Sequence, residues 1–190
     1  MTFDISIVSY LPNPIRTKIK KYQKLISEKF NTVRALDWVP HITIADRVLI
    51  PEDKFSNICS ELKKVCSKTK PIKVNTKKLC FILLTKSSLE NPYVVSLKVE
   101  TTKELQRLHD LIQNNICKGL KRPGYKSDKY SPHITLAYRD LTKENFKKVK
   151  QFFKNYPIKV NYSFKLDNIQ LVIPLRNERR RSIWMFKFKK

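Results

Sequence analysis

The chain has 190 residues, of which 41% are hydrophobic and 11% aromatic, so it can bury one sizeable core. Forty lysines and arginines against 16 acidic residues give a formal net charge of +24, which favours a polyanionic partner such as nucleic acid. No apolar run approaches the ~20 residues of a membrane-spanning helix, and the start, MTFDISIVSYLPNP, lacks the pattern of a signal peptide. We therefore expect an intracellular, cytoplasmic protein without a membrane partner.

The first part of the chain alternates between strand-like and helix-like patterns. Apolar and polar residues alternate at first, and apolar residues then recur at helical spacing behind prolines that suit a first helical turn. The predicted elements are a strand at Phe3–Tyr10, a helix from Pro14 to about Phe30, a strand at Val39–Ala45, a helix from Pro51 to about Cys66, and strands at Ile72–Asn75, Lys78–Leu84 and Tyr93–Val99.

A second, similar cycle follows. Thr101 or Thr102 can cap a helix that runs to about Cys117. The remaining predicted elements are a strand at His133–Tyr138, a helix at Lys143–Lys154, and strands at Ile158–Lys165, Asn168–Ile173 and Ile183–Phe188. The recurring order indicates an internal duplication.

This order predicts the α+β class, in a single domain spanning residues 1–190. We expect two lobes of antiparallel sheet with helices outside, related by a pseudo-twofold axis about a central cleft. One lobe is expected around residues 12–84 and the other around 101–174, and the chain ends can cross between them.

The four cysteines, Cys59, Cys66, Cys80 and Cys117, contain no C-x-x-C pair. They are interpreted as reduced, buried small side chains rather than as a zinc site.

One short motif occurs twice. Residues 40–47 read PHITIADR and residues 132–139 read PHITLAYR, so six of eight positions are identical. The chain has only three histidines, and two of them, His41 and His133, lie in these segments. A single histidine on an apolar strand is more often a core residue. A matched pair in matching context favours a functional role instead.

The paired residue types suit phosphodiester chemistry. Side chains two apart on a strand face the same way, so His41 would lie beside Thr43, and His133 beside Thr135. Imidazole titrates near neutral pH, so one ring can act as general base while the other acts as general acid. Threonine hydroxyls can donate hydrogen bonds to phosphate oxygens. This set of groups requires no metal or other cofactor.

The third histidine and the nearby acid are interpreted differently. His109 lies beside leucines on a predicted helix, outside the repeat, and is expected to be structural or at the surface. A metal-dependent nuclease needs clustered carboxylates, whereas the motif supplies only Asp46, which alternation directs away from His41.

At the two His-Ile-Thr segments the sequence resembles the two-histidine (2H) phosphoesterase superfamily, which carries one His-x-Thr/Ser motif in each lobe. The trailing Ala137 and Arg139 resemble members described as 2′-5′ RNA ligase-like or cyclic phosphodiesterases. The resemblance implies a metal-independent enzyme with His41, Thr43, His133 and Thr135 in its active site. Members open 2′,3′-cyclic phosphates, cleave 2′-5′ or 3′-5′ linked oligonucleotides, or destroy nucleotide signals.

Further residues are candidates for binding the substrate. Aromatic rings can stack on bases and arginines can contact phosphates. The candidate aromatic residues are Tyr10, Trp38, Tyr125 and Tyr130. The candidate arginines are Arg47, Arg139, Arg176 and Arg179–Arg181. Arg47 and Arg139 lie an even number of residues after their histidines, so each would share the catalytic face if its strand continued unbroken.

The sequence therefore predicts a phosphodiesterase that hydrolyses or transesterifies RNA-type phosphodiesters, without an obligate protein partner. Its substrates would be 2′,3′-cyclic phosphate ends or 2′-5′ or 3′-5′ linked oligonucleotides. One alternative is the degradation of a 2′-5′ oligoadenylate or cyclic oligonucleotide signal. Another is a non-catalytic RNA-binding module that keeps the fold.

Overall fold

The computed structural model describes residues 1–84, 91–123, 130–173 and 181–189. Of residues 181–183 it describes only the backbone. Its strands are β1 (Thr2–Tyr10), β2 (His41–Pro51), β3 (Ile72–Leu83), β4 (Tyr93–Val99), β5 (His133–Tyr138), β6 (Ser163–Leu166), β7 (Asn168–Ile173) and β8 (Arg181–Lys187). Its helices are α1 (Asn13–Phe30), α2 (Glu52–Lys68), α3 (Lys103–Asn115) and α4 (Lys143–Asn155), with a short 3₁₀ helix, η1 (Arg34–Asp37).

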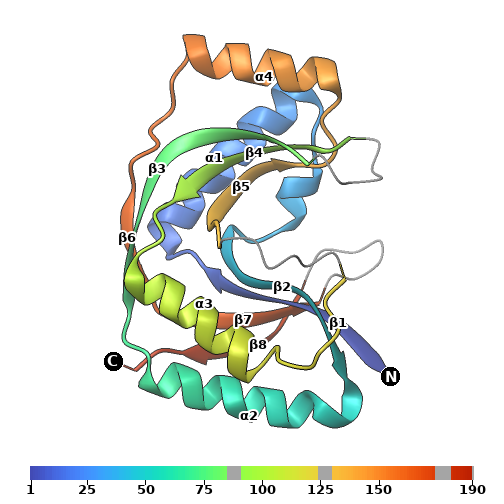
Figure 1. Cartoon of the computed structure of the whole chain (residues 1–190). Coiled ribbons are helices and arrows are strands. Elements are labelled where there is room, and N and C mark those ends of the chain that lie inside the picture. The colour runs from blue at the N-terminus through green and yellow to red at the C-terminus, as the bar shows by residue number, and fades with distance from the viewer. Residues whose placement is uncertain (85–90, 124–129, 174–180, 190) are drawn as a thin grey trace.

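The described strands form two four-stranded antiparallel sheets. One has the order β2-β1-β7-β8 and the other β5-β4-β3-β6 (Figure 1). The two orders correspond strand for strand, with β2 matching β5 and β1 matching β4. This confirms the predicted α+β class and the two antiparallel sheets. The C-terminal strands β7 and β8 complete the sheet that the N-terminal strand begins.

Helices α1 and α3 each cover the sheet to which their flanking strands do not belong. Helix α1 joins β1 to β2 but contacts β5, while α3 joins β4 to β5 but contacts β2. In Figure 1, α1 and α4 lie over the sheet of β3, β4 and β5, and α2 and α3 lie over the sheet of β1, β2, β7 and β8. The buried stripes of α1 and α3 therefore bind the two halves into one core.

Local sequence explains where the two later long helices begin. The Thr102 hydroxyl accepts a hydrogen bond from the Leu105 backbone N–H at 3.2 Å, and the Thr142 hydroxyl accepts one from Asn145 at 3.1 Å. Each hydroxyl satisfies one backbone donor that the first turn would leave unpaired. No described helix is both long and apolar enough to cross a membrane.

Strand β3 differs from its prediction as two separate strands. It runs unbroken from Ile72 to Leu83, with a register shift between Thr76 and Lys78. At that shift the Thr76 hydroxyl donates to the Val160 carbonyl and accepts from the Tyr162 N–H. The Thr76 N–H also donates to the Tyr162 carbonyl, and β6 begins at Ser163 rather than near residue 158.

Candidate active site

Each repeated motif opens a strand. His41 is the first residue of β2 and His133 is the first residue of β5. The isoleucine after each histidine is fully buried, whereas both histidines, Thr43 and Thr135 are half-buried. Alternation along the strand thus places the histidine and threonine of each motif on one face and the isoleucine on the core face.

The two histidines are held in the same way. The Nδ1 atom of His41 lies 2.7 Å from the Val39 carbonyl oxygen, and that of His133 lies 3.1 Å from the Ser131 carbonyl oxygen. A carbonyl only accepts, so Nδ1 carries the proton and donates in both rings. In the neutral form of each ring, Nε2 is therefore the unprotonated nitrogen.

A β-bulge follows the threonine in both motifs. In the ladder of β2 with β1, Val8 pairs with Thr43 but Ile7 pairs with Ala45, which leaves Ile44 as an extra residue. In the ladder of β5 with β4, the same shift after Thr135 leaves Leu136 as the extra residue. The duplication therefore extends beyond the sequence motif to an irregularity of the backbone.

The carbonyl groups around the first bulge accept hydrogen bonds from side chains of the second half of the chain. The His109 Nδ1 donates to the Ile44 carbonyl at 2.8 Å, and the Tyr130 hydroxyl donates to the Thr43 carbonyl at 3.0 Å. The rings of His109 and Tyr130 stack with their centroids 4.0 Å apart. His109 is buried and bonded, so its expected structural role is confirmed. Burial also raises the pKa of the Tyr130 phenol, which keeps it a donor near neutral pH.

The second bulge is bonded from the first half. The Gln23 side-chain amide of α1 donates to the Thr135 carbonyl at 2.9 Å. Gln23 is almost fully buried on the stripe of α1 that faces β5. The sequence analysis missed this residue, although a glutamine within an apolar helical stripe is a signal that a buried acceptor lies opposite.

The two arginines at the ends of the motifs do not continue the alternation. In β2 a second register shift follows the bulge, opposite Asp46 and Arg47, and β5 ends at Tyr138, before Arg139. Arg47 and Arg139 both have positive φ angles, 45° and 60°. The two arginines were expected on the face of the histidines only if each strand continued unbroken, and neither strand does. Arg47 forms an ion pair with Asp4 at 2.9 Å, and the Arg139 guanidinium lies 5.3 Å from the Tyr138 ring centroid.

Two of the predicted aromatic residues lie beside His41. Tyr10 is its cross-strand partner on β1. The Trp38 ring centroid lies 6.0 Å from that of His41 and 4.7 Å from that of Tyr138 on β5, so Trp38 connects the two motif strands. Tyr125, Arg176 and Arg179 lie outside the described residues, as does the Arg181 side chain.

Asn168 positions Tyr10 and was not predicted. Its side-chain amide accepts from the Tyr10 N–H and donates to the Tyr10 carbonyl, both at 3.1 Å. The amide thereby extends the contact of β7 with β1 from Val8, the last paired residue, to Tyr10, the last residue of β1. An asparagine at the first position of a strand is a weak signal for such a role.

Asp140 attaches the segment before Trp38 to the end of β5 and was also not predicted. Its carboxylate accepts from the backbone N–H groups of Val33 and Arg34, at 2.7 and 2.8 Å, and from the Thr32 hydroxyl. These bonds hold η1 against β5. The position of Asp140, one residue after the second motif, is the only signal the sequence offers.

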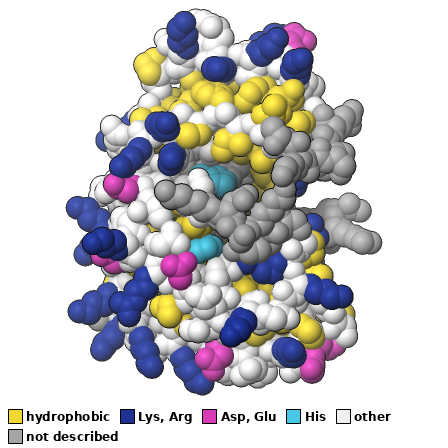
Figure 2. Space-filling model, viewed as in Figure 1, with side chains coloured by type: hydrophobic (Ala, Val, Ile, Leu, Met, Phe, Trp, Pro, Cys, Tyr) yellow, Lys and Arg dark blue, Asp and Glu magenta, His cyan; other side chains and the backbone are white. Residues whose placement is uncertain are grey.

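The two motif strands are neighbours in space. β2 and β5 contact each other, and they start close together at the centre of Figure 1. Figure 2 shows histidine side chains at the surface in two places near the middle of one face. Four half-buried polar side chains, two imidazoles and two hydroxyls, therefore come from adjoining strands.

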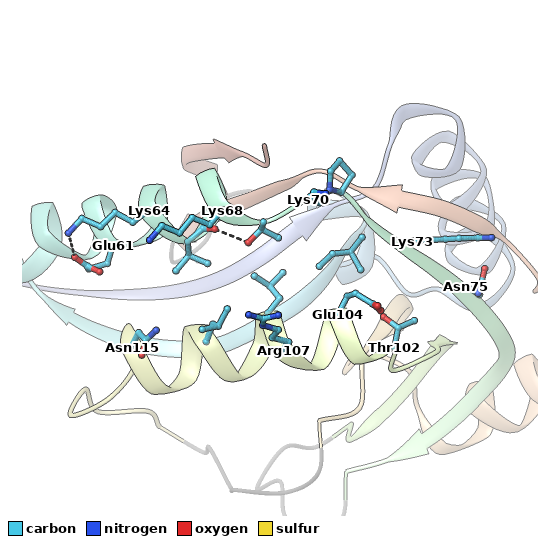
Figure 3. Close-up of a pocket in the computed structure, with 16 residues that line it drawn as sticks. Glu61, Lys64, Lys68, Lys70, Lys73, Asn75, Thr102, Glu104, Arg107 and Asn115 are labelled. Carbon is cyan, nitrogen blue, oxygen red and sulfur yellow. Dashed lines mark hydrogen bonds and ion pairs between the residues drawn. The ribbon is translucent and has the colours of Figure 1, made fainter. Parts of the chain in front are cut away.

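Two surface hollows flank α3. One of about 1320 Å³ borders the second motif, because Ser131, Tyr130 and Lys98 line it. The other, of about 870 Å³, lies between α2 and α3 (Figure 3). No motif residue lines either hollow, but the first includes Ser131, whose carbonyl oxygen is bonded to the His133 ring.

The described residues contain no group of three His, Cys, Asp or Glu side chains that could hold a metal ion. The four cysteines are free thiols, with Cys66 and Cys117 buried and the other two partly buried.

Paired His-x-Thr motifs on matching strands of two matching sheets define the 2H phosphoesterase class. The model of the 2′-5′ RNA ligase superfamily matches residues 11–178, and the chain belongs to this superfamily. No curated protein matches the chain in sequence.

Solved structures share the fold over the whole chain. Escherichia coli LigT complexed with 3′-AMP superposes with a TM-score of 0.68 at 13% identity, covering 100% of both chains. LigT complexed with NADP⁺ gives a TM-score of 0.66 at 15% identity, again over 100% of both chains. The protein TT0787 of Thermus thermophilus gives 0.67 at 14% identity, over 98% of each chain.

Proposed function

We propose that this protein is a metal-independent phosphodiesterase that acts on RNA-type phosphodiesters. Its substrates would be 2′,3′-cyclic phosphate ends or 2′-5′ or 3′-5′ linked oligonucleotides. The observation that carries the proposal is the repetition of one local geometry. In each motif the histidine donates through Nδ1 to the carbonyl two residues earlier, and a bulge follows the threonine.

His41 and His133 would divide the acid and base roles. For a 2′,3′-cyclic phosphate, the Nε2 atom of the neutral imidazole takes a proton from water, and the water oxygen bonds to phosphorus. The bond from phosphorus to one ribose oxygen breaks, and the protonated imidazole donates its Nε2 proton to that oxygen. The product is a phosphate monoester, and the two rings end with exchanged protonation states.

Thr43 and Thr135 would orient the phosphate. Each hydroxyl lies on the same face of its strand as the histidine and can donate a hydrogen bond to a non-bridging oxygen. Two donors from opposite sides restrict the rotation of the phosphate, which favours alignment of the attacking and leaving oxygens.

The comparisons support a nucleotide-type ligand. Structures with this fold are described as LigT complexed with 3′-AMP, ATP and NADP⁺. The net charge of +24 favours an RNA substrate further. Intact histidines and threonines in both motifs argue against a purely RNA-binding module.

Turnover of a 2′,3′-cyclic nucleotide tests the proposal, with 2′-5′ and 3′-5′ linked dinucleotides assayed in parallel and products identified by mass. Hydrolysis of at least one of these substrates by the wild-type chain, and its loss in His41→Ala and His133→Ala, is expected. A folded wild-type chain that binds RNA but turns over none of them would instead support the RNA-binding module.

A further inference from the structure

We propose that the hollow beside α3 binds the sugar-phosphate backbone of a single-stranded RNA that continues away from the phosphate at the two histidines. The substrate would then be an oligonucleotide rather than a mononucleotide. The inference rests on the proposed function only for the position of the reacting phosphate. Binding of the RNA can be measured without any turnover. We call this hollow the α3 groove; it is lined by Lys77, Lys78, Lys98, Glu100, Thr101, Thr102, Lys103, Gln106, Arg107, Asp110, Leu111, Asn114, Asn115, Tyr130 and Ser131.

A row of positive charge leads from the second motif into the α3 groove. Lys98 on β4 lies directly opposite His133, and Lys78 on β3 lies directly opposite Lys98. Cross-strand partners share a face of the sheet and follow one another at about 4.8 Å. Both lysines therefore lie on the same face of the sheet as His133, one and two strands away, and both side chains are exposed.

The opposite wall of the groove is also basic. Lys103 and Arg107 project from α3, and both side chains are exposed. Of the two acids in the lining, Glu100 is paired with Lys77 at 2.7 Å, and the hydrogen bond from that lysine lowers the pKa of its carboxyl. Asp110 accepts a hydrogen bond from Gln106 at 2.8 Å. Cations remain on both sides of the groove, as a polyanion requires.

The rest of the lining suits a phosphate backbone better than an apolar ligand. The remaining polar side chains can bond to phosphate and sugar oxygens; they are Thr101, Thr102, Gln106, Asn114, Asn115 and Ser131. Among the described residues that line the groove, Leu111 is the single aliphatic one. The groove, of about 1320 Å³, is therefore a polar and basic channel that adjoins the second motif.

The neighbouring hollow between α2 and α3 serves as a comparison. It shares Arg107 with the α3 groove and is also basic, through Lys64, Lys68, Lys70 and Lys73. Figure 3 shows these lysines along α2 and β3, and Lys64 is ion-paired with Glu61 at 2.7 Å. Figure 2 shows Lys and Arg side chains crowded over the region where Figure 1 places α2 and α3. Of these two hollows, only the α3 groove reaches the surroundings of a motif, which is why the strand is assigned to it.

The test compares binding of two RNA lengths to the wild-type chain and three lysine variants. Fluorescence anisotropy measures the affinity of labelled single-stranded RNAs of two and ten nucleotides over a range of salt concentrations. The groove variant combines Lys78→Gln, Lys98→Gln and Lys103→Gln. The charge-matched control variant combines Lys147→Gln, Lys150→Gln and Lys154→Gln, three exposed lysines of α4. A second control combines Lys68→Gln and Lys73→Gln in the hollow between α2 and α3.

The wild-type chain should bind the ten-nucleotide RNA more tightly than the dinucleotide. The groove variant should bind the longer RNA at least about tenfold more weakly. The slope of log affinity against log salt should become shallower by about 2, because each lost phosphate contact on a single strand removes about 0.7. The α4 variant should change affinity by less than about twofold, because exposed charges far from the strand are screened.

Equal losses in the groove variant and either control would overturn the assignment to the α3 groove. A ten-nucleotide RNA that binds no more tightly than the dinucleotide would also overturn it. A polyglutamate decamer that binds as tightly as the RNA, with the same loss in the groove variant, would show an acidic-peptide site instead. None of these readouts uses turnover, so failure of the proposed phosphodiesterase activity leaves the test intact and is recognised separately.

Discussion

The His109 Nδ1 donates a hydrogen bond to the Ile44 carbonyl, 2.8 Å away, at the residue where β2 bulges beside Thr43. In the second motif Gln23 donates to the Thr135 carbonyl at 2.9 Å, one residue before the bulge of β5. Each motif is thus supported by a helix that packs from the other half of the chain. The geometry of each motif strand therefore depends on a residue far away in sequence.

Removing either supporting side chain should destabilise the protein. His109→Leu and Gln23→Leu each leave a buried carbonyl without its donor, which costs about 1–3 kcal/mol of unfolding free energy. Urea denaturation measures the loss. The matched control is Gln151→Leu on the exposed surface of α4, expected within about 0.5 kcal/mol of the wild type. If the control and the two buried variants lose the same stability, the bonds to the bulges are not the cause.

The two motif histidines should behave as one catalytic unit. His41→Ala or His133→Ala alone should lower kcat by about 10²–10⁴, the usual contribution of a general acid or base. The double variant should be little worse than either single one, because both groups act in the same step.

The pH–rate profile checks the same pair. It should be bell-shaped in the wild type, since one ring must be neutral while the other is protonated, and its limbs belong to the pair. Circular dichroism of each variant separates a catalytic loss from a loss of folding. A folded variant with near-normal turnover would contradict the assignment.

The threonines should matter less than the histidines. Thr43→Val and Thr135→Val keep the size and branching of the side chain and remove a hydrogen bond to a charged phosphate, worth about 1.5–3 kcal/mol. Steady-state kinetics should therefore show a loss of about tenfold to a hundredfold in kcat/KM. Thr17→Val, at an exposed position of α1, is the control and should leave kcat/KM unchanged. An unchanged kcat/KM in both motif variants would exclude the hydroxyls from phosphate binding.

Chelation should leave catalysis intact. The proposed mechanism uses two imidazoles and two hydroxyls, so turnover in excess EDTA should equal turnover in untreated protein. The measurement compares initial rates before and after dialysis against the chelator. Loss of activity with recovery on adding a divalent ion would replace this mechanism with a metal-assisted one.

The cysteines should label in two classes. Burial raises the pKa of the Cys66 thiol to about 12 and that of the Cys117 thiol to about 11, so both stay protonated near pH 8. Intact mass after iodoacetamide should show labelling of Cys59 and Cys80 before the other two in the folded chain, and of all four in urea. Labelling of Cys59 should be slowed because burial also raises the pKa of its thiol. Rapid addition of four labels to the folded chain would contradict the burial.

The same thiols give a direction for stability against pH. The folded state keeps protons on Cys66 and Cys117 that the unfolded chain loses above the ordinary thiol pKa of 9.0. The unfolded state then binds fewer protons, so this contribution to stability is lost as pH rises from about 9 towards 11. Cys66→Ala and Cys117→Ala should each flatten that part of the stability profile.

The sequence by itself determined the features that depend on near neighbours along the chain. The repeated His-Ile-Thr segments, the two-residue alternation that separates His41 from Ile42, and the helix start at Thr102 all follow from local patterns. They are predictable because strand pleat and helix capping involve residues only a few positions apart.

The tertiary structure decided the features that are defined between distant segments. The bulge at Ile44 is defined only by its pairing with β1, so the motif residues alone do not predict it. The bulge and a second register shift at Asp46 and Arg47 together break the alternation that the sequence implies. Likewise, His109 supports the first motif and Gln23 the second only because α3 packs against β2 and α1 packs against β5. Such bonds form to satisfy buried carbonyl groups, and the partner that satisfies them is set by the packing of the two halves.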